Sequence, residues 1–78
     1  MPRYFYDVDD NGQLLRDDEG TDLESDGAAH YEGLRAMAEM AKDSLPGSGP
    51  QSTLTMSVRD ESGRIVSKNT LTFRSERL

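Results

Sequence analysis

The sequence predicts an α+β fold in which two strands, one helix and two further strands follow one another in the order ββαββ. One stretch, Asp26 to Leu45, has apolar residues at helical spacing. The chain on either side is rich in aromatic or alternating residues typical of strands, and each side contains a turn signal with glycine. We therefore expect an antiparallel sheet of about four strands with the single helix packed on one face.

The length and composition set limits on the class of protein. With 78 residues, of which 33% are hydrophobic and 31% charged, we expect one small α+β domain, residues 1–78, with a thin core. A second copy would complete such a core, so we expect a homodimer; any other protein partner is unknown. The chain has no cysteine and one histidine, which excludes a disulfide framework and a His/Cys metal cage, and we expect no cofactor.

The charge and hydropathy indicate the surroundings of the protein. The net charge is −6 and the acids are concentrated in residues 1–50, so we expect no nucleic-acid binding. No stretch approaches the roughly 20 apolar residues that cross a bilayer, and the first residues lack the basic start and apolar run of a signal peptide. We expect a soluble, cytoplasmic protein with no membrane contact.

The first predicted strand runs from Arg3 to Val8. Its alternation places two tyrosines and the valine on one face and Phe5 on the other. Residues 9–12 (DDNG) form a turn signal, because Asn and Gly tolerate a positive φ, and residues 13–16 return. Whether the loop has two or four residues, Leu15 joins the tyrosine face and Leu14 shares the other face with Phe5.

The predicted helix has apolar residues at steps of three and four, which place them on one side. We expect this side to pack on the sheet: Ala28, Tyr31, Leu34, Met37, Ala38, Ala41 and Leu45. Ser25 or Asp26 is the expected N-cap, since either side chain can accept a hydrogen bond from a first-turn N–H. Pro46 ends the helix, and residues 46–52 (PGSGPQS) form a linker.

The second strand pair consists of residues 53–59 (TLTMSVR), which alternate cleanly, and residues 64–74 (RIVSKNTLTFR), with a DESG turn between them. We expect their apolar side chains on the helix side: Leu54, Met56, Val58, Ile65, Leu71 and Phe73. Ser67 and Asn69 interrupt this face, so we expect a bulge there. The opposite face carries Val66 among basic residues and threonines.

The sheet face turned away from the helix is the candidate interface. Its apolar residues are Phe5, Leu14 and Val66, and exposed apolar patches mark sites of association. We therefore predict a non-catalytic interaction or self-association module that dimerises through this face or through a strand edge. We do not expect an enzyme, because a chain this small rarely holds the deep cleft in which paired carboxylates act.

A second hypothesis concerns calcium. Residues 7–12 (DVDDNG) have the D-x-D-x-N-G spacing of a calcium loop, in which alternating oxygens converge on the ion. Asp7, Asp9 and Asn11 would be ligands, Gln13 would offer its carbonyl, and Asp18 would close the site. However, Asp stands where such loops have Glu, and a hairpin turn explains the same residues without a metal.

Three segments resemble an uncharacterised family of short bacterial proteins: residues 1–5 (MPRYF), 16–20 (RDDEG) and 58–64 (VRDESGR). Members of that family typically open MPRYFFD, carry RDxEG before an Ala-rich helix, and end in a hairpin containing VRDExGR. The resemblance implies a domain of unknown function and carries over no catalytic residue.

The early strand pair, acidic loop and helix are also similar to HicB-type antitoxins. This chain departs from that family in having two long strands after the helix and no appended DNA-binding element. The likeness suggests a third hypothesis, an antitoxin-like partner whose acidic half masks a basic protein.

Overall fold

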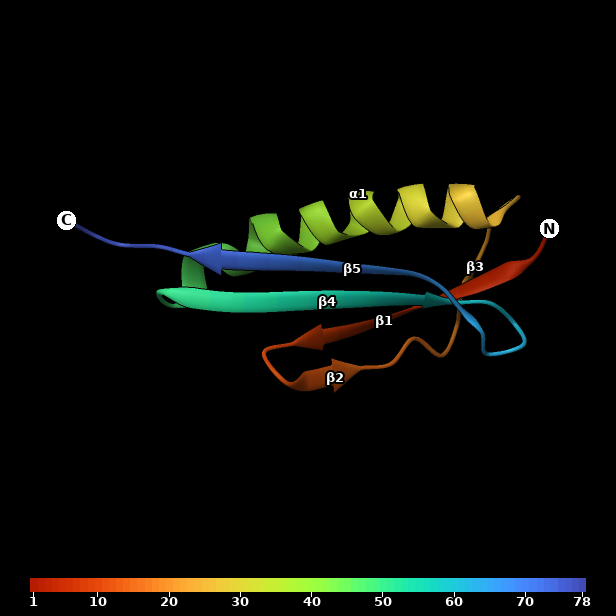
Figure 1. The fold of residues 1–78 in the computed structure, drawn as a ribbon, viewed down its shortest axis with the longest axis horizontal. Coiled ribbons are helices and arrows are strands. Elements are labelled where there is room, and N and C mark those ends of the chain that lie inside the picture. Colours follow the sequence, from red (N-terminus) through yellow and green to blue (C-terminus); the bar gives the residue numbers. More distant parts are fainter.

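The predicted order of elements is confirmed in the computed structural model, which describes residues 1–78. The elements are β1 (Arg3–Asp10), β2 (Gln13–Leu15), β3 (Thr21–Asp22), α1 (Asp26–Ser44), the 3-10 turn η1 (Leu45–Gly47), β4 (Gln51–Arg59) and β5 (Ile65–Arg74). α1 covers one face of an antiparallel sheet whose long strands follow the long axis of the molecule (Figure 1). The short β3 was not predicted. None of the helices has both the length and the apolar character needed to cross a membrane.

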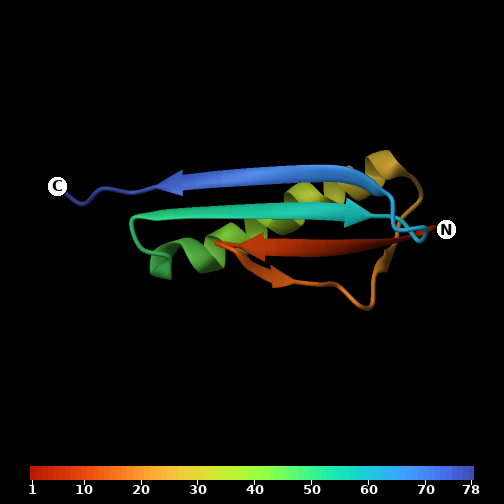
Figure 2. The same ribbon diagram turned by 60° about the horizontal axis from the view of Figure 1, so that its bottom comes forward.

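The sheet has the order β2-β1-β4-β5, and β3 pairs with the start of β1. β1 and β4 form its centre, with pairs that run from Phe5–Arg59 to Asp10–Leu54. The two hairpins are therefore joined into one sheet by strands that lie far apart in the sequence. Figure 2 shows α1 crossing behind the long strands, with β2 and β5 at the two edges.

The first hairpin uses the shorter of the two loops that the sequence allowed. Asn11 and Gly12 have φ angles of 51° and 91°, as a two-residue hairpin turn requires, and Val8 lies opposite Leu15. Asn11 also reaches the neighbouring hairpin, because its Oδ1 accepts the N–H of Thr53 at 2.8 Å. The turn thereby fixes the register between β1 and β4 as well as that between β1 and β2.

The buried side of α1 agrees with the predicted side at Met37 and Ala41 but differs from it elsewhere. Its buried residues are Ala29, Gly33, Met37 and Ala41, whereas Tyr31 and Leu34 are 65% and 46% exposed, and Ala38 is exposed too. The reason is space: a Cβ on Gly33 would lie 3.3 Å from Val58 Cγ2, so only small residues let the helix approach the sheet. Strand side chains then fill the thin core, with Val58 fully buried.

The start of α1 is tied to the sheet by polar contacts. The predicted N-cap is confirmed at Ser25, whose Oγ accepts the N–H of Ala28. The Tyr4 hydroxyl donates to Asp26 at 2.7 Å, and this bond together with burial raises the pKa of Tyr4 to about 12. The Tyr6 hydroxyl donates to the Ala29 carbonyl at 2.9 Å. Two tyrosines of β1 therefore set the height of the helix over the sheet.

A bulge opposite Val58 and Arg59 exchanges the expected positions of Ile65 and Val66. Ile65 pairs with Arg59 and is 58% exposed, so the prediction that Ile65 packs in the core is wrong. Val66, expected on the open face, packs instead against the buried cluster that contains Val58, because one extra residue reverses the alternation. The next residue, Ser67, lies on the helix side, where its Oγ is 2.6 Å from His30 Nδ1 and so has a hydrogen-bond partner.

The different burial of Met37 and Leu34, which were both predicted on the packed side of the helix, gives a stability prediction. We expect Met37→Ala to lower the free energy of unfolding by about 2 kcal/mol or more, because it opens a cavity between α1 and β4. Leu34→Ala, the matched control on the same helix, should cost about 0.5 kcal/mol or less because Leu34 is half exposed. Urea unfolding of both variants at low concentration checks this, and a larger loss for Leu34→Ala would contradict the assignment.

Candidate functional site

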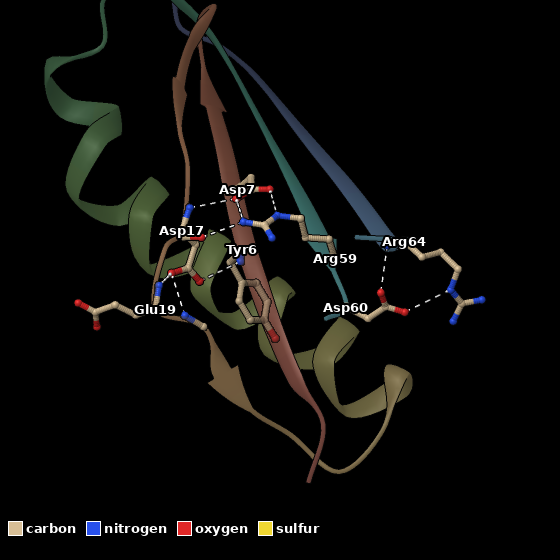
Figure 3. A network of polar contacts seen from close by, with 8 residues as sticks. Tyr6, Asp7, Asp17, Glu19, Arg59, Asp60 and Arg64 are labelled. Carbon is tan, nitrogen blue, oxygen red and sulfur yellow. Dashed lines mark hydrogen bonds and ion pairs between the residues drawn. The ribbon is translucent and has the colours of Figure 1, made fainter. Parts of the chain in front are cut away.

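The three segments that carry the family resemblance meet at one end of the sheet. Figure 3 shows Asp7 of β1, Asp17 of the loop after β2 and Arg59 at the end of β4 joined by hydrogen bonds. Sequence reasoning missed this cluster because it depends on the pairing of β1 with β4. The alternation of residues along β1 and β4 could have indicated the cluster, because it places Phe5, Asp7 and Arg59 on the same sheet face once the two strands are neighbours.

Arg59 holds the cluster together. Its Nε donates to Asp7 Oδ2 at 2.7 Å and its Nη2 donates to the carbonyl of Asp17 at 2.9 Å, while its guanidinium lies 4.5 Å from the centroid of the Phe5 ring. The Arg59 and Asp7 side chains are only 17% and 13% exposed. A planar guanidinium can make all these contacts at once, which an ammonium could not.

Asp17 closes the outer edge of β1 in the gap between β2 and β3. One of its carboxylate oxygens accepts the N–H of Tyr6 at 3.0 Å, and the other accepts the N–H groups of Glu19 and Gly20 at 3.1 Å each. Its own N–H donates to Asp7 Oδ1. The side chain thus takes the place of a neighbouring strand for β1.

The pKa values of both carboxyls reflect these bonds. Burial alone would raise the pKa of Asp7, but the Arg59 hydrogen bond, the Asp17 N–H and the Arg59 charge together lower it below its usual value. Burial likewise opposes ionisation of Asp17, and the N–H groups of Tyr6, Gly20 and Glu19 lower its pKa. Both groups are held as structural anions.

Gly20 allows the acidic loop to lie against β1. Its φ is 77°, and a Cβ there would come within 2.8 Å of Arg3 Cγ and 2.9 Å of Phe5 Cε1. Arg3 in turn binds the Glu19 carbonyl and the Asp22 carboxylate. The loop is therefore packed on the Phe5 ring from one side while Arg59 covers it from another.

This packing bears on the predicted interface, which consists of Phe5, Leu14 and Val66. Phe5 is partly covered by the loop and by Arg59, and Val66 lies on the helix side. Leu14 is 63% exposed but pairs with Asp9, several residues along β1 from Phe5. The three residues are thus not brought together into one apolar patch.

The calcium hypothesis does not fit the geometry of residues 7–18. Asp7 is paired with Arg59, and Asp9 accepts the N–H of Gly12 within the turn. The Asn11 amide is bonded to β4, with its Nδ2 donating to Ser52. No cluster of three His, Cys, Asp or Glu side chains is arranged to hold a metal ion. A hairpin and an ion-pair cluster use these residues instead.

The outer edge of β5 is the longest unpaired edge of the sheet. Thr53 exchanges backbone hydrogen bonds with the β1 side, because the Asn11 N–H donates to its carbonyl and its N–H donates to Asn11 Oδ1. Since successive residues of a strand alternate, Leu54 and Met56 point their backbone groups at their β5 partners, Leu71 and Asn69.

The intervening residues of β5 therefore direct their N–H and C=O groups away from the sheet: Lys68, Thr70, Thr72 and Arg74. β5 has ten residues and no strand beyond it, whereas β2 at the opposite edge has three. The sheet thus presents one long open edge.

A hollow lies beside the end of this edge, between α1 and β5. It has a volume of about 610 Å³, and its lining includes Leu45, Phe73 and Ser75, with Lys42 and Arg77 as its two cations. Neither cation takes part in an ion pair, unlike Arg3, Arg59 and Arg64. The hollow near the end of β5 is therefore lined by both apolar and basic residues.

Together these features define a small α+β protein with one closed and one open sheet edge. The chain belongs to the family described as a domain of unknown function (DUF6894), whose model matches residues 3–72. The predicted membership in a family of unknown function is thereby confirmed. No curated protein matches the chain, and no solved structure does.

The Arg59 cluster gives a second stability prediction. We expect Arg59→Met to lower the free energy of unfolding by about 2–3 kcal/mol, because it leaves the partly buried Asp7 carboxylate without its partner. The control is Arg35→Met, which breaks an exposed ion pair on α1 and should cost less than about 1 kcal/mol. Equal losses in urea unfolding would show that the cluster contributes no more than a surface ion pair.

The lowered pKa values of Asp7 and Asp17 predict sensitivity to acid. As the pH falls, the unfolded chain binds protons before the folded chain does. The stability due to these carboxylates is therefore complete above the ordinary Asp pKa of about 4 and is lost as the pH falls through the lower folded values. Urea unfolding between neutral and strongly acidic pH should show a smaller acid loss in Asp17→Asn than in wild type. The exposed neighbour Asp18→Asn is the control; if the three profiles have the same slope, Asp17 makes no such contribution.

Proposed function

We propose that the protein is a non-catalytic self-association module in which two copies join along the outer edges of their β5 strands. The observation that carries this proposal is the open edge of β5, where Lys68, Thr70, Thr72 and Arg74 have outward-facing backbone groups. Strand addition satisfies such groups with a second chain and is a common mode of association. The prediction of dimerisation through a strand edge is thus narrowed to one edge.

The opposite edge is a poor site for strand addition. β2 covers residues 8–10 of β1, the Asp17 carboxylate takes the N–H of Tyr6, and β3 pairs with Arg3 and Tyr4. These three contacts leave no long unpaired stretch on the outer edge of β1. An antitoxin-like role would rest on the exposed acids of this side, such as Asp18 and Glu19, but they belong to the closed edge, so the geometry favours β5.

The side chains of β5 favour one register of the pairing. In an antiparallel pair centred on Thr70, Lys68 lies opposite Thr72 of the partner and Arg74 lies opposite Val66. A pair centred on Leu71 would instead place Lys68 opposite Arg74, and like charges directly opposite one another are destabilising. A pair centred on Thr72 would extend beyond the end of β5 at Arg74. The register centred on Thr70 uses β5 alone and opposes no like charges.

Twofold pairing of β5 also closes the assembly. Both long edges are used in the dimer, and the edges that remain are the three-residue β2 strands. An isologous contact of this kind ends at two copies and does not propagate into fibres.

Proline at an outward-facing position tests the proposal. Thr70→Pro removes an N–H that points away from β4, so the chain should keep its fold but lose the dimer, whereas Thr70→Val keeps the N–H and should remain dimeric. Sedimentation velocity at micromolar concentration measures the oligomeric state. Asn69→Pro, which removes an N–H directed at β4, should unfold the hairpin and so confirms which backbone groups face outward.

Two results would overturn this function: a monomeric wild type over the measured concentration range, or a Thr70→Pro variant that is folded and still dimeric. In the second case the contact surface would lie elsewhere on the molecule. Circular dichroism of each variant establishes that it is folded before its oligomeric state is compared.

A further inference from the structure

Leu34 is an apolar side chain that projects sideways from α1. Its neighbour Gly33 faces the sheet, because a Cβ there would lie 3.3 Å from Val58 Cγ2 and 3.5 Å from Asn69 Nδ2. Successive residues of a helix are about 100° apart around its axis, so Leu34 extends roughly parallel to the sheet. The single copy leaves 46% of Leu34 exposed.

Two contacts of nearby helix residues show to which side Leu34 points. His30 lies one turn before Leu34 on the same side of α1, and its Nδ1 is 2.6 Å from Ser67 Oγ of β5. Glu32 lies on the opposite side, where burial and, after it, the charge of Glu32 raise the pKa of Tyr6 of β1 to about 12. Leu34 is therefore directed over β5, toward the open edge of the sheet.

Leu71 is a second apolar side chain at this edge. It lies on the helix side of β5 and packs from one side against the core cluster that contains Met37 and Leu54. It is only partly buried, because no strand lies beyond β5 to cover its other side. A strand added to β5 would cover that side.

The β5 pairing proposed above brings the two leucines together. With Thr70 at the centre, Asn69 of one copy lies opposite Leu71 of the other, because each is one position from the centre. Both side chains of such a pair point to the same face, so the two helices lie on the same face of the joined sheet. Gly33 is beside Asn69, so Leu34 extends at this level toward Leu71 of the other copy. We infer that Leu34 of each copy packs on Leu71 of the other.

The distances allow this contact. At Gly33 the helix lies above β4, so Leu71 of the other copy is about two strand spacings, or about 10 Å, to the side. A helix with its side chains reaches about 5–6 Å from its axis, so Leu34 covers more than half of that distance. The remaining gap is about the 4 Å at which two apolar side chains touch.

The apolar residues of this flank of α1 also favour a second copy as the partner. Steps of four, three and four residues place the following residues on one side of the helix: Leu34, Ala38, Ala41 and Leu45. Only Ala41 is buried in the single copy. The flank continues the open edge of β5, so a second copy that pairs with β5 also faces the flank.

Dissociation constants test the contact, which rests on the proposed β5 dimer. Leu34→Ala should raise the dissociation constant of the dimer about tenfold or more, because the twofold axis removes the contact twice. Tyr31→Ala is the matched control. It removes a larger exposed side chain from the outer side of the same helix, and it should change the constant by less than about threefold. Equilibrium sedimentation gives the constants, and an unchanged constant in Leu34→Ala would overturn the contact.

A second measurement needs no substitution. A dimer is prepared by mixing isotope-labelled and unlabelled wild-type protein, and filtered nuclear Overhauser spectra then detect only contacts between the two copies. We expect a cross-peak between the methyl groups of Leu34 and Leu71. A dimer that shows other cross-peaks between its copies but not this one rules out the assignment of Leu71 as the partner of Leu34.

The failure of this contact and the failure of the β5 dimer give different results. Thr70→Cys places two thiols at the twofold axis, on the sheet face away from α1, and should cross-link with itself whenever β5 pairs as proposed. If Thr70→Cys cross-links and Leu34→Ala leaves the dissociation constant unchanged, the leucine contact is wrong and the strand pairing stands. If wild type is monomeric and Thr70→Cys does not cross-link, both are wrong.

Discussion

The guanidinium of Arg59 joins the acidic loop to the two central strands of the sheet. It binds Asp7 of the central strand and the carbonyl of Asp17 in the acidic loop, and it covers the ring of Phe5. Each contact constrains the next, because the loop must lie flat on β1 before Asp17 can accept the N–H of Tyr6. The position of the acidic loop, and with it the closure of one sheet edge, depends on this residue. A partly buried cation is tolerated here because its charge and its donors are matched.

The strands could be predicted from the sequence with more success than the helix face. Leu54, Met56 and Val58 alternate with polar residues, and a period of two leaves one choice of buried face. In α1, alanines occur on several sides, so the spacing of apolar residues does not distinguish Leu34 from Met37. Steric space decides, through the approach of Gly33 to Val58. The missed signal was the four-residue spacing of Ala29, Gly33, Met37 and Ala41, three of which are small.

The candidate site was harder to predict because it depends on contacts between distant segments. Phe5 was correctly placed on the face away from α1, but its cover by Arg59 and by the Gly20 loop follows from the β1–β4 pairing. Val66 was misplaced because the position of a bulge is set by the ladder as a whole, and one extra residue exchanges the facing of Ile65 and Val66 while the later residues of β5 keep the expected facing. The polar residues of the motif segments are here explained by the closure of a sheet edge.

The open edge of β5 offers backbone hydrogen bonds to a second chain, but these bonds contribute little net free energy to association. Outward N–H and C=O groups on β5 bond to water in the single chain, so pairing them with a second chain exchanges one set of hydrogen bonds for another. The net gain is only about 1 kcal/mol for each bond, and part of it offsets the lost freedom of the two chains. Backbone pairing therefore fixes the register better than it provides affinity.

Affinity must come from apolar surface that the single chain leaves in water. The single chain leaves open the hollow that Leu45 and Phe73 help to line, near the end of β5. Burying a large aromatic side chain in a pocket of matching polarity is the kind of contact that dominates binding energy at interfaces. The hollow near Phe73 lies close to the strand edge that we propose to pair, so an apolar side chain of a second copy that entered it would add affinity to the backbone pairing.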